Sequence, residues 1–226
     1  MTDFNVPQTS VAIADSNERF PVRRIFCIGQ NYAAHAREMG GDPDREPPFY
    51  FNKAADTVVA SGSVVDYPPR TDDLQHEIEL VVAIKKGGRN ISVAHAGEHV
   101  FGYAVGIDLT RRDLQAQAKA SGWPWDVAKN FDQSAPVGEI HTVASIGHPS
   151  SGRIWLAVNG DGRQDGNLNE MIWAVPQLLA EISTYCALAA GDLVFTGTPA
   201  GVGKLAPGDL ITGGVEGVGE IGIEIR

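Results

Sequence analysis

The sequence predicts a mixed α+β protein in which a β-rich, rolled sheet dominates. Segments that read as strands outnumber those that read as helices, and the two kinds do not alternate regularly along the chain. A regular alternation would instead indicate a doubly wound α/β fold. An N-G-D-G turn at residues 159–162 joins two alternating segments, which is the strongest hairpin signal in the chain.

The strand-like segments come in a clear order. The first twenty residues read as irregular, so we separate an N-terminal arm, residues 1–22, from a single domain over residues 23–226. Apolar runs then predict strands at 23–29, 49–52, 57–67, 74–84 and 100–108. After residue 191 we expect only short strands separated by glycines.

Three segments have helical patterns. Residues 31–40 form the first, with Asn31 as a plausible N-cap, and residues 110–122 form the second, with Thr110 and Asp113 resembling a capping box. Each of these two ends at a glycine, which is a common helix stop. Residues 175–188 are the longest amphipathic segment, with a proline tolerable in the first turn.

Composition and charge exclude several classes of function. With 226 residues, 43% hydrophobic and 20% charged, the chain has the profile of an ordinary globular domain. Its net charge of −10 argues against nucleic acid and against an anionic membrane surface as partners. The absence of a secretory signal or a membrane-length apolar run leads us to expect a cytoplasmic protein. An anionic ligand would need local cations.

Two glutamates in the strand at 74–84 form the first candidate site. Side chains alternate along a strand, so Glu77 and Glu79 point to the same face. An E-x-E pair commonly lies on the solvated face of an antiparallel sheet, but the unbroken apolar run 80–84 indicates a strand covered on both faces. A divalent cation would remove the mutual repulsion of two buried carboxylates. Carboxylate ligands without Cys or His favour Mg²⁺ or Mn²⁺.

Asp108 is the best third ligand, because it ends another buried strand. A turn or helix-capping aspartate is an equally good interpretation of this residue. On the helix at 31–40, His35 and Glu38 share a face. By spacing alone a surface ion pair is the more common outcome. As a functional pair, Glu38 would orient His35 so that the imidazole can take a proton from water.

Three further polar residues are candidates for substrate contacts. Lys129 lies in an aromatic stretch and is either a snorkelling lysine or a local cation for an anionic substrate. Gln115 is either a surface glutamine or an amide donor. Thr198, in the glycine-rich turn at 195–203, could hold a carboxylate with its hydroxyl and nearby backbone N–H groups.

Five segments together resemble the fumarylacetoacetate hydrolase family. They occur in the order FCIGQNYAAHAREMG, HEIELVVAI, GYAVGIDLTRRDLQ, VAKNFDQSAPVG and GDLVFTGTPAGVG, and the resemblance covers the chain from about Arg23 onward. Residues 19–49 are similar in particular to the fumarylpyruvate hydrolases of gentisate degradation. The resemblance implies a metal-dependent hydrolase that cleaves the C–C bond of an acylpyruvate, foremost fumarylpyruvate to fumarate and pyruvate. Oxaloacetate decarboxylation and acetylpyruvate hydrolysis on the same site are alternatives.

The resemblance also implies roles for the candidate residues. Glu77, Glu79 and Asp108 would bind Mg²⁺ or Mn²⁺, His35 and Glu38 would activate water, Lys129 and Gln115 would contact the substrate and its oxyanion, and Thr198 would bind its carboxylate. It further implies a β-rich roll, a homodimer, and a catalytic domain without the extra N-terminal domain of longer relatives. A non-catalytic metal-binding protein would leave His35, Glu38 and Lys129 without a function.

The sequence departs from the family pattern at two positions. Gln30 stands where relatives commonly have a basic residue, and Ala54 where a proline often follows the lysine. Neither position is a proposed metal ligand. Both departures concern the part of the site that holds the distal end of the substrate, and so they concern its identity.

Overall fold

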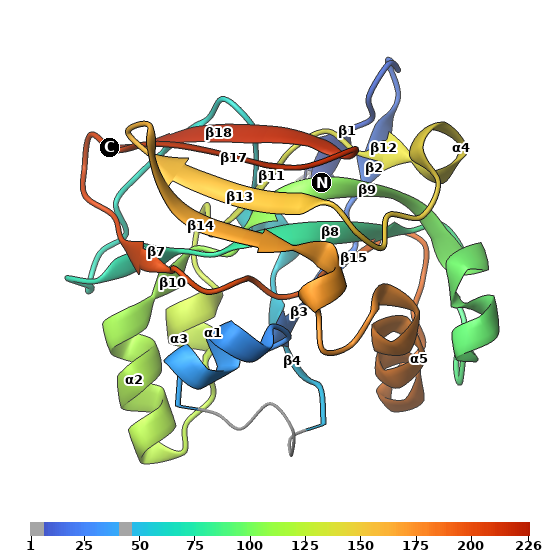
Figure 1. The fold of residues 1–226 in the computed structure, drawn as a ribbon, viewed down its shortest axis with the longest axis horizontal. Coiled ribbons are helices and arrows are strands. Elements are labelled where there is room, and N and C mark those ends of the chain that lie inside the picture. The colour runs from blue at the N-terminus through green and yellow to red at the C-terminus, as the bar shows by residue number, and fades with distance from the viewer. Residues whose placement is uncertain (1–6, 41–46) are drawn as a thin grey trace, which may run out of the picture.

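The larger of two principal sheets forms the centre of the protein (Figure 1). The structure, a computed structural model, describes residues 7–40 and 47–226. Neighbouring strands of the larger sheet are, in spatial order, β4 (Phe49–Lys53), β3 (Arg24–Gly29), β15 (Asp192–Phe195), β8 (Ile78–Ile84), β9 (Val100–Ile107), β11 (Ala135–Val137) and β5 (Val58–Ala60). The short strand β12 (His141–Thr142) also pairs with β9.

The second sheet packs against the first. Its order is β14 (Asp161–Asn167), β13 (Arg153–Val158), β17 (Leu210–Val215), β18 (Gly219–Ile225) and β6 (Val64–Val65). The main hydrophobic core contains side chains of both sheets, such as Leu80 and Val105 from the larger and Leu156 and Ile223 from the smaller. This arrangement confirms the predicted β-rich α+β fold.

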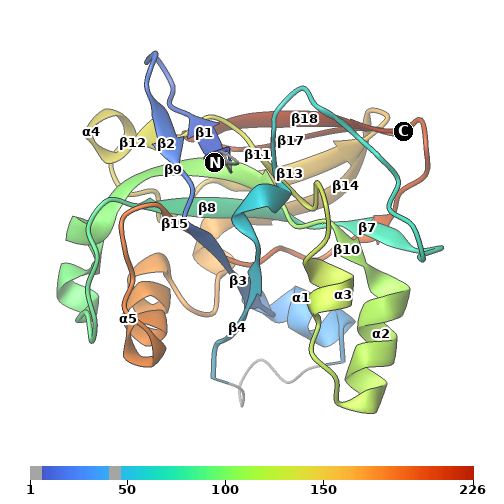
Figure 2. The ribbon, with the colours of Figure 1, turned by 180° about the vertical axis from the view of Figure 1, so that it is seen from behind.

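Most of the helices lie below the sheets in both views (Figures 1 and 2). The short helix at residues 143–146 is the exception and lies beside β12. The helices are α1 (Ala33–Glu38), α2 (Arg112–Ser121), α3 (Asp126–Lys129), α4 (Val143–Ile146) and α5 (Val175–Tyr185), and single-turn or short 3₁₀ segments are η1 (Ala55–Thr57), η2 (Val93–His99) and η3 (Leu168–Glu170). A small sheet of β10 (Thr110–Arg111), β7 (Leu74–His76) and β16 (Gly203–Lys204) connects the large sheet to α2. In the described part of the chain, none of the helices has the length and apolarity that crossing a bilayer requires.

The N-terminal arm was expected to be irregular, and in its described part this is wrong. Strands β1 (Ser10–Ala12) and β2 (Arg19–Pro21) form an antiparallel hairpin, while residues 1–6 lie outside the described residues. Val11 and Phe20 bury their side chains in a second core cluster. Burial of these apolar side chains stabilises the hairpin against the sheet. Two strands therefore form here although the sequence signal for each strand is weak.

The predicted turn and the predicted caps had opposite outcomes. Asn159 and Gly160 both have positive φ, 54° and 85°, as the type I′ turn between β13 and β14 requires. The N-cap at Asn31 is wrong, because its side-chain amide donates to the Trp173 and Thr196 carbonyl oxygens instead. Tertiary partners outcompete the local cap.

The capping box of α2 is also absent. Its N-cap is Arg111, which makes no side-chain cap bond. The Thr110 hydroxyl donates to the Asp108 carbonyl oxygen, and Asp113 accepts from the Thr71 hydroxyl. The Thr110 hydroxyl therefore does not cap the helix, and Asp113 joins the segment at Thr71 to the first turn of α2.

Candidate active site

Strand pairing brings the three candidate carboxylates together. β7 ends at His76 and β8 begins at Ile78, so Glu77 lies at a break between two strands. Ile78 pairs with Ile107 across β8 and β9, and the Asp108 N–H donates to the Glu77 carbonyl oxygen at 2.8 Å. The chain therefore places Asp108 beside the glutamate pair without help from a loop.

The carboxylate triad, Glu77, Glu79 and Asp108, has the geometry of a metal site. One carboxylate oxygen of each lies within 4.8 Å of the others, and all three residues are buried. Asp108 Oδ1 accepts no hydrogen bond from the described residues, although Lys53 Nζ lies 2.9 Å away. Three buried oxygen donors without thiolate or imidazole suit a hard divalent cation. The residues present therefore fit such an ion.

Cationic side chains surround the triad. Lys129, at the end of α3, places its Nζ 2.7 Å from both Glu77 Oε2 and Asp108 Oδ2, while Arg112 lies 2.5 Å from Glu77 Oε1. Burial alone would raise the pKa of Glu77, but Lys129 and Arg112 outweigh it and hold that pKa well below its usual range. Burial acts to lower the pKa of Lys129, and the charges of Asp108 and Glu77 reverse this and raise it. Lys129 is thus a buried ion-pair partner and not a snorkelling lysine.

Sequence reasoning missed Arg112 and Lys53. Arg112 precedes Gln115 by three residues on α2, so helical spacing from the candidate Gln115 could have found Arg112. Lys53 ends β4, and its Nζ contacts Asp108 and the backbone oxygen of Leu109. No local pattern marks Lys53, because its partners are more than fifty positions away in the chain.

Hydrogen bonds orient the amide and hydroxyl candidates. Arg112 donates to Gln115 Oε1 at 2.6 Å, and because a guanidinium can only donate, the Gln115 NH₂ group is left as a donor. The Thr198 Oγ1 accepts a bond of 2.8 Å from Gln164 Nε2. Gln115 and Thr198 are both buried and line the same pocket. Neither is an ordinary surface residue.

His35 and Glu38 form a dyad at the pocket's edge. His35 Nδ1 lies 3.0 Å from Glu38 Oε2, and Glu38 Oε1 accepts from the Gly201 N–H at 3.4 Å. The His35 side chain is only 6% exposed, unlike an ordinary surface pair. His95 and Glu98 provide the contrast, because they have the same spacing with both side chains exposed.

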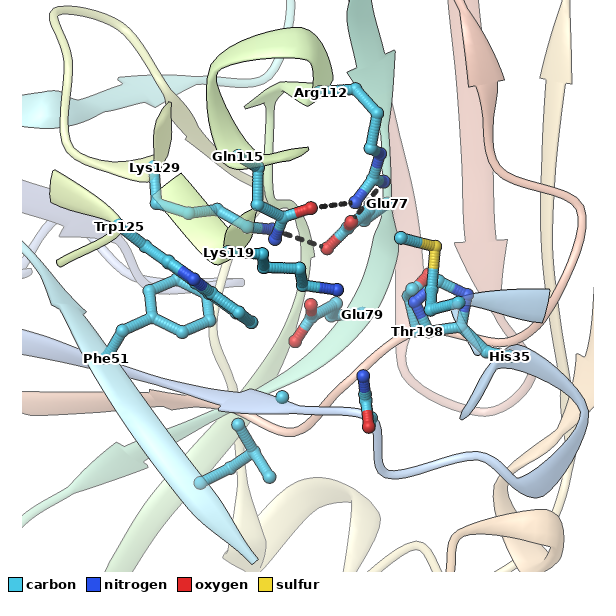
Figure 3. A pocket seen from close by; sticks show the side chains of 14 residues that line it. His35, Phe51, Glu77, Glu79, Arg112, Gln115, Lys119, Trp125, Lys129 and Thr198 are labelled. Carbon is cyan, nitrogen blue, oxygen red and sulfur yellow. Dashed lines mark hydrogen bonds and ion pairs between the residues drawn. The ribbon is translucent and has the colours of Figure 1, made fainter. Parts of the chain in front are cut away.

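Most of these groups line one pocket. Figure 3 shows His35 and Thr198 on one side of it, with Gln115, Lys129 and Glu77 opposite. Its labelled lining residues are His35, Phe51, Glu77, Glu79, Arg112, Gln115, Lys119, Trp125, Lys129 and Thr198. The pocket therefore combines two carboxylates of the triad, the imidazole of the dyad and hydrogen-bond donors, while Asp108 contacts Lys129 and Glu38 contacts His35. Such a set can bind an anion and activate water beside it.

Comparisons with known proteins identify the family. The model "Fumarylacetoacetate (FAA) hydrolase C-terminal" matches residues 24–226. The chain belongs to the fumarylacetoacetate hydrolase family. Among curated family members, it is 44% identical to the fumarylpyruvate hydrolase of Ralstonia sp over 189 residues, which cover 83% of this chain and 98% of that protein. It is 39% identical to a mitochondrial oxaloacetate tautomerase of Arabidopsis thaliana over 203 residues, which cover 90% and 91%.

A solved family structure is similar over the whole chain. The crystal structure of fumarylpyruvate hydrolase from Pseudomonas aeruginosa in complex with Mn²⁺ and pyruvate has a TM-score of 0.97 and 46% identity, covering 100% of this chain and 98% of that one. That family member binds a divalent metal. With the carboxylate triad of this chain, the comparison supports divalent-metal binding here.

Without a cation, Glu79 makes the site unfavourable for folding. Its carboxylate is 1% exposed and accepts from the Gly197 N–H at 2.6 Å. Burial, followed by the charges of Asp108 and Glu77, raises the pKa of Glu79 well above its ordinary value. In the unfolded chain a glutamate carboxyl ionises at about pH 4.3. Above that pH the unfolded chain loses the proton while buried Glu79 keeps it, so the native state becomes less stable. This loss of stability continues until the pH exceeds the pKa of Glu79 in the folded protein.

We therefore expect Glu79→Gln to stabilise the metal-free protein at neutral pH. The melting temperature in EDTA should rise by roughly 2–4 °C for each kcal/mol that the substitution adds to the free energy of unfolding. Added Mn²⁺ should raise the melting temperature of the wild type and leave that of the variant unchanged. A variant that melts at or below the wild type in EDTA would contradict the interpretation of Glu79 as a destabilising buried acid.

Proposed function

We propose that this chain is a metal-dependent hydrolase that cleaves the C–C bond of an acylpyruvate, with fumarylpyruvate, giving fumarate and pyruvate, as its substrate. The observation that carries the proposal is that Glu77 and Glu79 of the carboxylate triad line one pocket together with His35, which Glu38 contacts. A site that only stabilised an enolate would need the metal ligands but no group to activate water. The dyad adds that function.

The charges of the pocket support an anionic substrate. Glu77 and Asp108 are each in contact with cationic side chains, which are Lys53, Arg112 and Lys129. Together with Glu79, three carboxylates thus face three cations, so a bound divalent ion leaves the site with an excess positive charge. A dicarboxylate such as fumarylpyruvate compensates that charge, although the chain as a whole carries −10.

In the proposed reaction, Glu77, Glu79 and Asp108 hold Mg²⁺ or Mn²⁺. When bound, the ion would supply a Lewis acid at the 2-oxo acid end of the substrate. Thr198 holds the carboxylate of that end. His35, oriented by Glu38, takes a proton from a water molecule, whose oxygen attacks the distal carbonyl carbon.

The developing oxyanion is stabilised by donors from α2 and α3. Lys129 has three N–H bonds and directs two at Glu77 and Asp108, so one is left for the oxyanion. The Gln115 NH₂ group is the second donor. When the C–C bond breaks, its electron pair stays with pyruvate as the enolate, and the proton held by His35 returns to that carbon. One water is consumed, and the new carboxylic acid of fumarate releases its proton to solvent, so atoms and charges balance.

Lys119 supports a substrate with a second carboxylate. It lies one turn beyond Gln115 on α2, about 6 Å further along the helix axis. Figure 3 shows Lys119 reaching into the pocket, and its Nζ lies 5.2 Å from the centre of the Trp125 ring. An extended acylpyruvate held at Thr198 and Gln115 would direct its distal carboxylate toward this part of the pocket. Lys119 then distinguishes fumarylpyruvate from acetylpyruvate, which lacks that group.

Replacing Lys119 by Gln should therefore change substrate choice. A charge-assisted hydrogen bond contributes about 1.5–3 kcal/mol, so we expect kcat/KM for fumarylpyruvate to fall ~10-fold or more, with acetylpyruvate nearly unaffected. Lys85→Gln, at an exposed lysine outside the pocket, serves as the control. Equal losses for both substrates would show that Lys119 does not recognise the distal carboxylate.

A second candidate function is oxaloacetate turnover on the same site. The 39% identity to an oxaloacetate tautomerase favours it. Decarboxylation of oxaloacetate needs an enolate but no attacking water, so a His35 variant that retains turnover would indicate this function. The homodimer, the cytoplasmic compartment, the role in aromatic catabolism and the identity of the ion as Mg²⁺ or Mn²⁺ stay predictions.

The decisive experiment is a panel assay of the purified chain. Loss of diketo-acid absorbance is followed for fumarylpyruvate, acetylpyruvate and related acids, and oxaloacetate is followed in parallel, each with EDTA, Mg²⁺ or Mn²⁺. The proposal expects metal-dependent hydrolysis with the highest kcat/KM for fumarylpyruvate. Metal-dependent melting shifts without turnover of any of these acids would instead support a non-catalytic metal-binding protein.

A further inference from the structure

Gln164 is a buried amide whose hydrogen-bonding capacity is fully used. Its Oε1 accepts from the Ile78 N–H at 3.1 Å and lies 2.9 Å from His76 Nδ1. Its Nε2 donates to Thr198 Oγ1 and to the Pro199 carbonyl oxygen, both at 2.8 Å. Gln164 is 1% exposed. One side chain thus joins the strand that carries the metal-ligand glutamates to the turn that carries Thr198.

The position of Gln164 in the hairpin is itself unusual. It lies on β14, where the flanking Arg163 and Asp165 are exposed and Gln164 is buried. The pairing of β13 with β14 shifts register next to Gln164: Leu156 pairs with Gln164, and Ala157 with Gly162. A bulge of this kind re-aims side chains near functional sites. Here it leaves Gln164 directed inward from an otherwise polar strand.

The orientation of this amide is determined by backbone groups. The Ile78 N–H can only donate, so the atom facing it is the oxygen, and the Pro199 carbonyl can only accept, so the atom facing it is the nitrogen. Thr198 Oγ1 must then be the acceptor in its bond with Gln164. A hydroxyl that accepts in one direction has its proton available in another. The Thr198 hydroxyl proton is therefore directed away from Gln164.

We propose that Gln164 is a positioning residue that makes the Thr198 hydroxyl a hydrogen-bond donor to the carboxylate of a bound 2-oxo acid. The inference rests on the proposed function, in which Thr198 binds that carboxylate. Thr198 lines the pocket, whereas Gln164 stands behind it and is not among the lining residues. Gln164 acts on the ligand only through Thr198. Its effect should therefore appear in ligand affinity and KM more than in the chemical step.

Two substitutions of Gln164 separate hydrogen bonding from charge. Gln164→Glu keeps an acceptor for Ile78 and His76, but its second oxygen cannot donate, so Thr198 would turn its proton toward that oxygen. Gln164→Met has nearly the same length and no charge. We expect the dissociation constant of pyruvate, measured by calorimetry with saturating Mn²⁺, to rise ~10-fold in the Glu variant and several-fold in the Met variant. KM should rise in parallel, with a smaller change in kcat.

The Thr198→Val background provides the critical comparison. Without the hydroxyl, each Gln164 substitution should weaken pyruvate binding no further, because residues that act as a unit give non-additive effects. Asp165→Asn, on the same strand but exposed, should leave pyruvate affinity unchanged. Wild-type affinity in both Gln164 variants, or the same loss with and without the Thr198 hydroxyl, overturns the inference.

Failure of the proposed function has a different signature. If the wild type binds pyruvate but hydrolyses no acylpyruvate, the hydrolase proposal is overturned. The pyruvate affinities of the Gln164 variants, with and without Thr198→Val, still decide the role of Gln164. A wild type that binds no pyruvate in the presence of Mn²⁺ overturns both. If Gln164→Glu does not fold, the uncharged Met variant carries the same comparison.

Discussion

Replacing Glu77 by Gln is expected to abolish divalent-metal binding and turnover together. Glu77 contributes one carboxylate of the triad, and it is also the common partner of Lys129 and Arg112. Its loss removes one negative charge from the site while Lys129 and Arg112 remain, so a divalent ion meets uncompensated repulsion from these two cations. Mn²⁺ calorimetry and the fumarylpyruvate assay should both give no signal above background.

A matched substitution controls for the loss of a carboxylate as such. Glu98→Gln removes the same group from an exposed pair with His95, and it should leave metal affinity and rate unchanged. Full activity of a metal-stripped Glu77→Gln variant would end the metal hypothesis. Loss of activity with wild-type Mn²⁺ affinity would instead remove Glu77 from the ligand set.

Replacing His35 by Ala should lower kcat while the metal site stays intact. General-base catalysis contributes roughly 10²–10⁴-fold, so kcat for fumarylpyruvate should fall by at least 10². Mn²⁺ and pyruvate affinities should change little, because His35 makes its observed hydrogen bond to Glu38 and not to the triad. The measurement is single-turnover hydrolysis beside calorimetry on the same preparation.

The chain offers a control with the same geometry. His95 lies 2.9 Å from Glu98 at the same three-residue spacing, but both side chains are exposed and outside the pocket. His95→Ala should hydrolyse at the wild-type rate. If His35→Ala also does so, the dyad is not catalytic, and oxaloacetate decarboxylation, which needs no attacking water, becomes the better explanation of the site.

Much of the site could be predicted because its geometry is local or follows from strand periodicity. Glu77 and Glu79 share a face through the two-residue repeat of a strand, and His35 meets Glu38 through the helical repeat. The unbroken apolar run after Glu79 correctly predicted burial of β8 on both faces. These relations hold for any chain with the same local structure.

The helix caps could not be predicted where the partners of a capping candidate are distant in the sequence. Asn31 has the right chemistry for an N-cap, but Trp173 and Thr196, distant in sequence, offer its amide better-placed partners. The partners of Lys53 and Gln164 lie on segments distant in the sequence, and nothing within a few residues of either side chain indicates them. Such contacts depend on which segments the sheet brings together.

By itself, the sequence determined the fold class, the family, and the pairs of side chains that a strand or helix repeat places on one face. Only the tertiary structure decided that Lys129, Arg112 and Lys53 contact carboxylates of the triad, and that Gln164 donates a hydrogen bond to Thr198. The physical reason is that buried charges and amides need partners within about 3 Å. In this protein those partners come from segments that meet only when the sheets have formed.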